Sequence, residues 1–230
     1  MNLTISMPNN LLEAVYIPDC LRKLENLRNL LNNRGSQKEC FYLLEYAYTR
    51  SVYEEQIRFT PQGEMIFPIY NKGLPLLAKC SPHRGDWDKP NQRFKLSSFL
   101  YAESFSLRKN KMPQIIEQFL KLDSLSMELG SFHTLCEHNR TQIDGDNYQG
   151  KTEILAECVK RSIRYAQVQP SVIQVDYYQG HQQLEIPYLD QMSRIQPNLI
   201  LVLRFENEKW FMPTVLPRKY LESNKKLRLN

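Results

Sequence analysis

Three pairs of short apolar segments, each pair joined by a tight turn, constrain most strongly what this 230-residue chain can fold into. The pairs are 56–60 with 64–70, 171–178 with 182–189, and 198–206 with 209–216. Segments of this length with turn residues between them are typical of antiparallel β-hairpins. Pro213 restricts the last segment to a sheet edge or a bulge, because proline cannot donate a ladder hydrogen bond. We therefore expect antiparallel hairpins that form a sheet.

Helical periodicity marks other parts of the chain. Leucines recur at helical spacing over residues 21–31, and Gly35 is expected to end that helix. Ser36 and Glu39 form a capping-box pattern, in which each side chain satisfies a backbone donor at the start of the next helix. The clearest helical pattern covers residues 151–168, with apolar side chains along one side. These segments predict an α+β fold, with an N-terminal helical pair and one long helix packed on the sheet.

The remaining segments set the predicted domain organisation. Residues 1–18 are polar and contain Pro8 and Pro18, so we expect a loosely attached arm. Between the hairpins we expect an exposed loop, a strand and a short helix over residues 81–93, 94–105 and 113–122, respectively. No repeat and no linker long enough to divide the chain is visible in the sequence. The prediction is an arm and helix over residues 1–35, followed by a single α+β domain over residues 36–230.

Charge favours an anionic partner. Lysine and arginine number 30 against 25 acidic residues, which gives a net charge of +5. Such a balance suits nucleic acid, a nucleotide or an acidic membrane surface. No stretch approaches the roughly 18 apolar residues of a membrane span, and the N-terminus lacks the basic flank and apolar run of a signal peptide. We therefore expect no membrane partner and a cytoplasmic location.

The sequence indicates no metal or cofactor site. Its five cysteines are spaced singly, without a Cys-x-x-Cys pair, so neither a disulfide framework nor a zinc site is predicted. Asp144 and Asp146 lie in a glycine-containing segment but lack the other ligands of a calcium loop. The sequence also lacks the motifs of P-loop, dinucleotide-binding, zinc-protease and serine-hydrolase enzymes. Whether the chain is an enzyme is left open at this stage.

One segment could carry chemistry. His133, Cys136, His138 and Arg140 fall within eight residues. A histidine beside an arginine could perform acid–base catalysis on a phosphodiester while the arginine neutralises its charge. A cysteine–histidine pair can also form a nucleophile. The structural alternative is that His133 forms a hydrogen bond within a helix and the other side chains are exposed.

Basic residues interleaved with aromatic ones form the second candidate. They are Lys160, Arg161, Arg164, Tyr165, Tyr177, Tyr178, His181, Trp210, Phe211, Arg218, Lys219, Tyr220, Lys225, Lys226 and Arg228. Lysine and arginine neutralise phosphates, and exposed aromatic faces stack on unpaired bases. The alternative is that alternate aromatic residues of each hairpin belong to the core.

A succession of short motifs runs through residues 40–230. The motifs are Asn71-Lys72-Gly73-Leu74; His133-Thr134-Leu135 with Asn139 and Arg140; Val172-Ile173-Gln174 with Tyr177 and Tyr178; Ile186-Pro187-Tyr188; and Tyr220, Asn224 and Arg228-Leu229. In this order they resemble a bacterial and fungal family known as a domain of unknown function, number thirty-eight twenty-five in that series. Relatives in that family are often fused to LOTUS and cold-shock modules, so the resemblance implies an RNA-related context and no particular reaction.

We therefore hypothesise that the chain binds RNA or other single-stranded nucleic acid. The predicted polar cleft is formed by Asn71, His133, Asn139, Arg140, Gln174 and Tyr177. The predicted basic surface adds Arg161, Arg164, Arg218, Lys225, Lys226 and Arg228. One alternative is an enzyme that acts on a phosphodiester or nucleotide through His133 and Arg140. Another is a protein-interaction module of a stress or defence system, in which the aromatic residues contact a partner protein.

Overall fold

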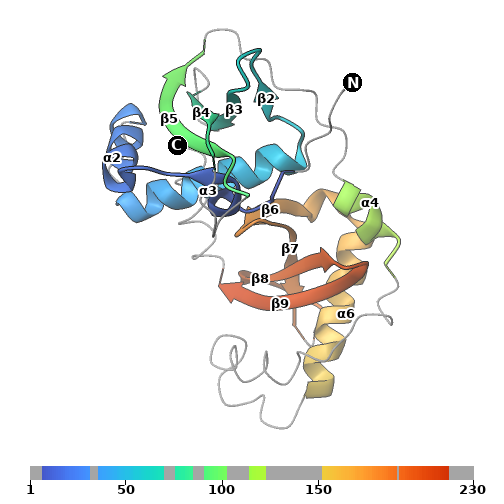
Figure 1. Ribbon diagram of the computed structural model, residues 1–230. Helices are drawn as coiled ribbons and strands as arrows, with labels where there is room; N and C mark the ends of the chain where they lie inside the picture. The colour runs from blue at the N-terminus through green and yellow to red at the C-terminus, as the bar shows by residue number, and fades with distance from the viewer. Residues whose placement is uncertain are drawn as a thin grey trace. The chain divides into compact units, whose positions relative to one another are not determined.

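The computed structural model describes residues 7–31, 36–69, 76–84, 91–102, 114–122, 152–190 and 192–217 (Figure 1). These residues form two compact units. The first contains the described residues up to Ala102 together with Tyr177–His181, and the second contains those of 114–176 and 182–217. Both units combine helices with strands, so the predicted α+β class is confirmed. In the described part of the chain, no helix is long and apolar enough to cross a membrane.

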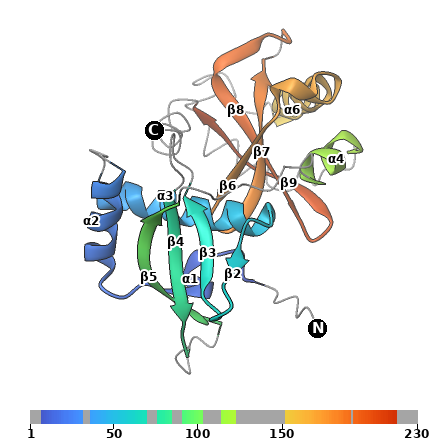
Figure 2. The ribbon, with the colours of Figure 1, turned by 90° about the horizontal axis from the view of Figure 1, so that it is seen from above.

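The first unit contains a mixed sheet with the strand order β1-β5-β4-β3-β2 (Figure 2). Its strands are β1 (Val15–Tyr16), β2 (Arg58–Phe59), β3 (Met65–Ile69), β4 (Leu76–Pro82) and β5 (Phe94–Tyr101). β1 is parallel to β5, and the other neighbouring strands are antiparallel. The hairpin expected around residues 61–63 is confirmed as β2 and β3, and the strand expected over residues 94–105 is confirmed as β5.

The helices of the first unit cover one face of this sheet. They are α1 (Leu11–Ala14), α2 (Cys20–Leu30) and α3 (Gln37–Tyr53). The capping box is confirmed at the start of α3, where Ser36 Oγ accepts from Glu39 N at 3.3 Å and the Glu39 carboxylate accepts from Ser36 N. One face of α3 packs against β3 and brings Leu44 and Tyr48 into the core. The alternation of apolar side chains in β3 and β4 supplies the other side of that core.

Residues 11–15 are part of the core, which corrects the expectation of a loosely attached arm for the described part of residues 1–18. Leu11, Ala14 and Val15 are buried, and Val15 pairs with Phe94 in the sheet. Tyr48 Oη also donates to the carbonyl of Pro8 at 2.8 Å. The apolar run at residues 11–15 is short and flanked by polar residues and prolines, so its burial depends on a partner distant in sequence.

The predicted boundary at residue 35 does not coincide with the division between the units. Leu24 and Leu27 of α2 belong to the same buried cluster as the core residues of α3. Because the two helices share one core, α2 cannot be separated from the segment that follows it. The hairpins also fall into two sheets, one in each unit, in place of a single sheet.

β4 has no counterpart among the predicted elements, and part of the predicted loop 81–93 belongs to the sheet. Ser81 and Pro82 complete β4 and pair with Lys95 and Phe94. Gln92 is buried, and its Nε2 donates to the carbonyl of Leu12 at 2.6 Å. Polar residues of this segment thus form the end of a strand and a buried hydrogen bond. The abundance of turn residues in the segment predicted a loop and gave no sign of either.

The second sheet is antiparallel with the order β6-β7-β8-β9 and belongs to the second unit, apart from the turn segment Tyr177–His181. Its strands are β6 (Gln174–Tyr178), β7 (His181–Leu189), β8 (Ile195–Glu206) and β9 (Lys209–Pro217). The helix α6 (Thr152–Val168) confirms the predicted long helix, and it packs with α4 (Gln114–Leu120) on the sheet (Figure 1). Both predicted two-residue turns, Gln179-Gly180 and Asn207-Glu208, have positive φ at each residue, as type I′ hairpin turns require. β9 is an edge strand, as Pro213 predicts.

Burial of the N-terminal segment predicts that alanine substitutions at two adjacent leucines differ greatly in their effect on the free energy of unfolding. Leu11 is 1% exposed and Leu12 is 47% exposed. We expect Leu11→Ala to lower the free energy of unfolding by about 2–5 kcal/mol, because it leaves a cavity in the core. Leu12→Ala should change it by less than about 0.5 kcal/mol. Denaturant titration of both variants measures the difference, and equal, small effects would show that the segment is a loose arm after all.

A second expectation concerns Cys80 in the same core. Burial raises the pKa of its thiol to about 12, from an ordinary value of 9.0. The folded protein therefore keeps the proton at a pH where the unfolded chain loses it. The contribution of Cys80 to the free energy of unfolding is therefore full below pH 9. Between pH 9 and pH 12 the free energy of unfolding falls by about 1.4 kcal/mol per pH unit.

The test is to measure the free energy of unfolding of the wild-type protein and of Cys80→Ala over about two pH units, from about pH 8.5 to about pH 10.5. The fall with pH should be shallower in Cys80→Ala. Cys20→Ala is the matched control: burial raises the pKa of the partly buried Cys20 thiol as well, but Cys80 is the more deeply buried thiol, so Cys20→Ala should change the fall less than Cys80→Ala does. The same slope in all three proteins would contradict the assignment to Cys80.

Candidate nucleic-acid interface

Part of the face of the first sheet that points away from the buried core carries polar and charged side chains, whereas Pro68 and Leu77 on the same face are apolar and buried. Along β5, Phe94 and Leu96 are buried in the core, so the alternating residue Lys95 lies on the opposite face. Tyr16 of β1 and Ser81 of β4 flank Lys95 in register on its two sides. The polar face is defined here by Tyr16, Glu64, Lys79, Ser81, His83, Arg93, Lys95 and Ser97. Three strands distant in sequence therefore contribute to one surface.

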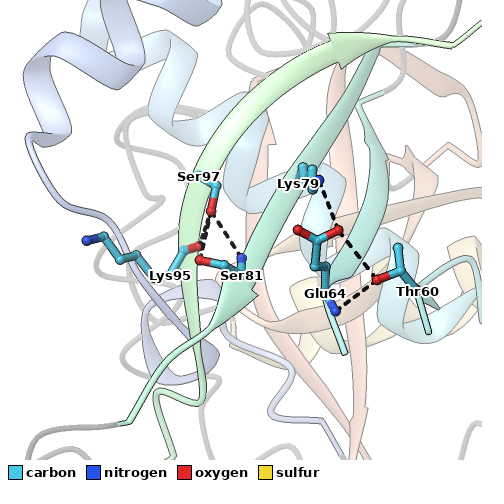
Figure 3. A network of polar contacts seen from close by, with 6 residues as sticks. All are labelled: Thr60, Glu64, Lys79, Ser81, Lys95 and Ser97. Carbon is cyan, nitrogen blue, oxygen red and sulfur yellow. Dashed lines mark hydrogen bonds and ion pairs between the residues drawn. The ribbon is translucent and has the colours of Figure 1, made fainter. Parts of the chain in front are cut away.

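Hydrogen bonds hold the centre of the polar face in place (Figure 3). Ser97 Oγ accepts from Ser81 N at 3.2 Å and donates to Ser81 Oγ at 2.9 Å. These contacts lie beside the register shift between β4 and β5 at Lys79 and Cys80. Lys23 of α2 donates to the carbonyl of Ser97 and ties the helix to the same strand. The surface around Lys95 is therefore built on a fixed backbone.

An ion pair neutralises one side of the polar face (Figure 3). Lys79 Nζ lies 2.9 Å from Glu64 Oε2, and both side chains are partly exposed. Thr60 Oγ1 accepts from Glu64 N at 3.1 Å and lies 3.4 Å from Glu64 Oε2, so the turn between β2 and β3 orients the carboxylate. Because an adjacent carboxylate cancels most of its field, Lys79 adds little positive potential to the face.

The other side of the face is basic. Arg93 and Lys95 are exposed and lie two residues apart on the same side of the chain. Arg84 is also exposed. Among the described residues, none of these three has a carboxylate within ion-pairing distance. Uncompensated cations on a fixed surface attract phosphates.

A stacked aromatic pair lies beside these cations. The rings of Tyr16 and His83 have centroids 5.2 Å apart and planes inclined by 20°. His83 N donates to the carbonyl of Arg93 at 2.8 Å, which extends the pairing of β4 and β5 by one residue. Tyr16 is 40% exposed although the residue before it is fully buried. The pair therefore presents aromatic surface to solvent next to Lys95.

Several predicted site residues lie outside the described residues. These are Asn71, His133, Asn139, Arg140, Arg218, Lys225, Lys226 and Arg228. The predicted acid–base pair and the basic C-terminal segment therefore stay predictions. Two predicted residues lie on α6, where Arg164 is exposed and Arg161 Nε lies 3.3 Å from Glu157 Oε1.

Gln174 and Tyr177 do not converge in a cleft as expected. They lie three positions apart along β6, so their side chains point to opposite faces of the strand. Gln174 is exposed, whereas Tyr177 is buried and its hydroxyl donates to Glu54 Oε1 at 3.0 Å. The Tyr177 ring contacts those of Tyr46 and Tyr53 within the first unit. Its ring faces are thus used within the protein.

Trp210 belongs to the core, as the alternative reading of the aromatic residues predicted. It is 7% exposed and contacts Phe119 edge to face, with ring centroids 5.7 Å apart. Phe205 also packs against it. Tyr178, by contrast, is 37% exposed at the end of β6.

The residues of the polar face were not predicted from the sequence. Tyr16 lies in the segment expected to be an arm, and His83 and Arg93 lie in the segment expected to be a loop. A usable signal exists in residues 93–96, where basic and apolar side chains alternate as in a strand with one basic face. The pairing of Tyr16 with Lys95 has no local signal, because 79 residues separate them.

A second group of polar side chains lies in the sheet of the second unit. Gln183 Nε2 donates to Asp176 Oδ2 at 3.2 Å, and Arg204 Nε donates to Gln183 Oε1 at 3.3 Å. Asp176 and Gln183 are buried, as is the neighbouring carboxylate Glu185. These bonds run across β6, β7 and β8 and satisfy buried polar atoms with one another.

The described residues contain no group of three or more His, Cys, Asp or Glu side chains placed to hold a metal ion. Their cysteines are free thiols, and Cys40, Cys80 and Cys158 are buried.

Comparison with known proteins gives no family: no protein-family model, no curated protein and no solved structure matches the chain.

Proposed function

We propose that the chain binds nucleic acid, RNA in the first place, along the polar face of the first sheet. The observation that carries the proposal is the arrangement of exposed Arg93 and Lys95 beside the stacked rings of Tyr16 and His83. Cations neutralise backbone phosphates and release their counterions, which supplies most of the affinity of such complexes. The excess of basic residues over the whole chain favours the same class of partner.

Exposed Arg164 on α6 could add a phosphate contact in the second unit. The proposal is in keeping with the RNA-related context that the family resemblance implies, and we propose a cytoplasmic location with it. The enzymatic and protein-interaction alternatives depend on residues outside the described part of the chain or on partners of unknown chemistry. No described contact favours either alternative over nucleic-acid binding.

The first test is the salt dependence of binding to a fluorescent single-stranded RNA. Affinity should fall steeply between about 50 mM and about 200 mM salt. Arg93→Gln and Lys95→Gln should each weaken binding and reduce the slope of log affinity against log salt by about 0.7. Fluorescence anisotropy measures both quantities.

Lys121→Gln is the control for this test, since it removes the same charge from an exposed position of the second unit. It should leave the slope close to that of the wild type. If Arg93→Gln and Lys95→Gln retain the wild-type slope, phosphates do not contact the polar face and the proposal is wrong.

A gain of affinity is expected when the acidic partner of Lys79 is removed. Glu64→Gln leaves Lys79 without its neighbouring negative charge, so RNA binding should tighten and its salt slope should steepen. Folding should tolerate the change, because an ion pair this exposed contributes about 0–1 kcal/mol. The matched variant is Glu157→Gln, which removes the carboxylate beside Arg161 on α6.

Titration of both glutamine variants with the same RNA distinguishes the two surfaces. Tighter binding by Glu64→Gln alone supports the polar face. Tighter binding by Glu157→Gln alone places the RNA on α6, where the sequence predicted Arg161 and Arg164, and contradicts the assignment to the first sheet.

A further inference from the structure

We infer that the Tyr16–His83 pair is a stacking platform for an unpaired base, which makes single-stranded nucleic acid the ligand of the polar face. This inference rests on the proposed function and adds the kind of strand that is bound. Phosphate contacts alone do not distinguish a duplex from a single strand, because both carry the same backbone. An exposed aromatic face does, since a base inside a duplex is already stacked on its neighbours.

The backbone on both sides of the platform is fixed. Tyr16 follows Val15, which is fully buried, and both pair with β5 in a parallel ladder. On the other side, the backbone of His83 is bonded to that of Arg93. Two rings on rigid strands lose little conformational freedom when a third ring is added to the stack.

Exposure identifies the open side of the pair. Tyr16 is 40% exposed, whereas His83, its partner in the stack, is less exposed. The core beneath Tyr16 is already closed by Val15 and Phe94. An exposed ring in this position contributes little to the core, and its free face is available to a ligand.

The positions of the cations relative to the Tyr16 ring indicate which class of ligand fits the polar face. Lys95 is the register neighbour of Tyr16, at the separation of adjacent strands, and Arg93 follows on the same side of β5. A ligand that satisfies both features must carry flat aromatic groups and negative charges side by side. Nucleotides in a single strand have this alternation, whereas an acidic peptide would use the cations and leave the platform empty.

The test compares two strands of equal length and charge, one of DNA and one in which every base is replaced by an abasic site. Strands about 12 nucleotides long fall within the range that one small domain covers. Wild-type protein should bind the strand with bases more tightly than the abasic strand and more tightly than a blunt duplex. Polyglutamate of equal charge serves as the peptide competitor and should bind no more tightly than the abasic strand.

Substitutions at the platform separate stacking from charge. Tyr16→Leu keeps the apolar bulk but removes the ring, so affinity for the strand with bases should fall by between about fivefold and about a hundredfold. Its affinity for the abasic strand should not change. Tyr16→Phe keeps the ring and should bind as the wild type does, which separates stacking from the loss of a hydroxyl hydrogen bond.

A 2-aminopurine base within the strand gives an independent readout, because its fluorescence is quenched on stacking. Quenching should occur with the wild type and Tyr16→Phe and be lost with Tyr16→Leu. Melting temperatures of all variants verify that folding is retained.

Equal affinity of the wild type for the abasic strand and the strand with bases would overturn the platform and leave the proposed function intact. Preferential binding of the duplex or of polyglutamate would also overturn it. Failure of the proposed function has a different signature, because then no strand, abasic or not, shows salt-dependent binding that Arg93→Gln and Lys95→Gln reduce.

Discussion

The parallel pairing of β1 with β5 is the contact on which the polar face depends. Two residues of β1 align with two of β5, and this short ladder places Tyr16 next to Lys95. A parallel pair this short is weak by itself. Its stability comes from the burial of Leu11, Ala14 and Val15 beneath it and from the hydrogen bond between Gln92 and Leu12. Hydrophobic burial on one side of the sheet thus determines which side chains meet on the other.

Local features of the fold could be predicted from the sequence, because local interactions determine them. The capping box at Ser36 and Glu39 requires residues only three positions apart, and the type I′ turns require only their own two residues. Pro213 indicated an edge strand through the missing donor of a single residue. The pairing of β1 with β5 involves segments far apart, and β4 begins with three consecutive apolar residues, Leu76 to Ala78, which obscure the alternation of its core side chains. Their positions follow from tertiary contacts that no short window of sequence contains.

The candidate site was harder to predict than the fold, for a geometric reason. A strand sends successive side chains to opposite faces, so residues near one another in sequence need not share a surface. Gln174 and Tyr177 illustrate this, since one is exposed and the other is bonded to Glu54. Tyr16 and His83 illustrate the converse, because residues 67 positions apart stack on one another. The basic composition suggests an anionic partner, which is the class of partner proposed above. Composition does not indicate where on the molecule that partner is contacted.

The two outermost strands of the first sheet, β1 and β2, are each only two residues long. Short edge strands are one way in which a sheet resists edge-to-edge aggregation. β1 and β2 pair with only two residues each of β5 and β3, so they do not cover the rest of those longer strands. A sheet with charged side chains on one face is suited to partners that approach that face. Recognition by this unit is therefore expected to depend chiefly on the side chains of the polar face.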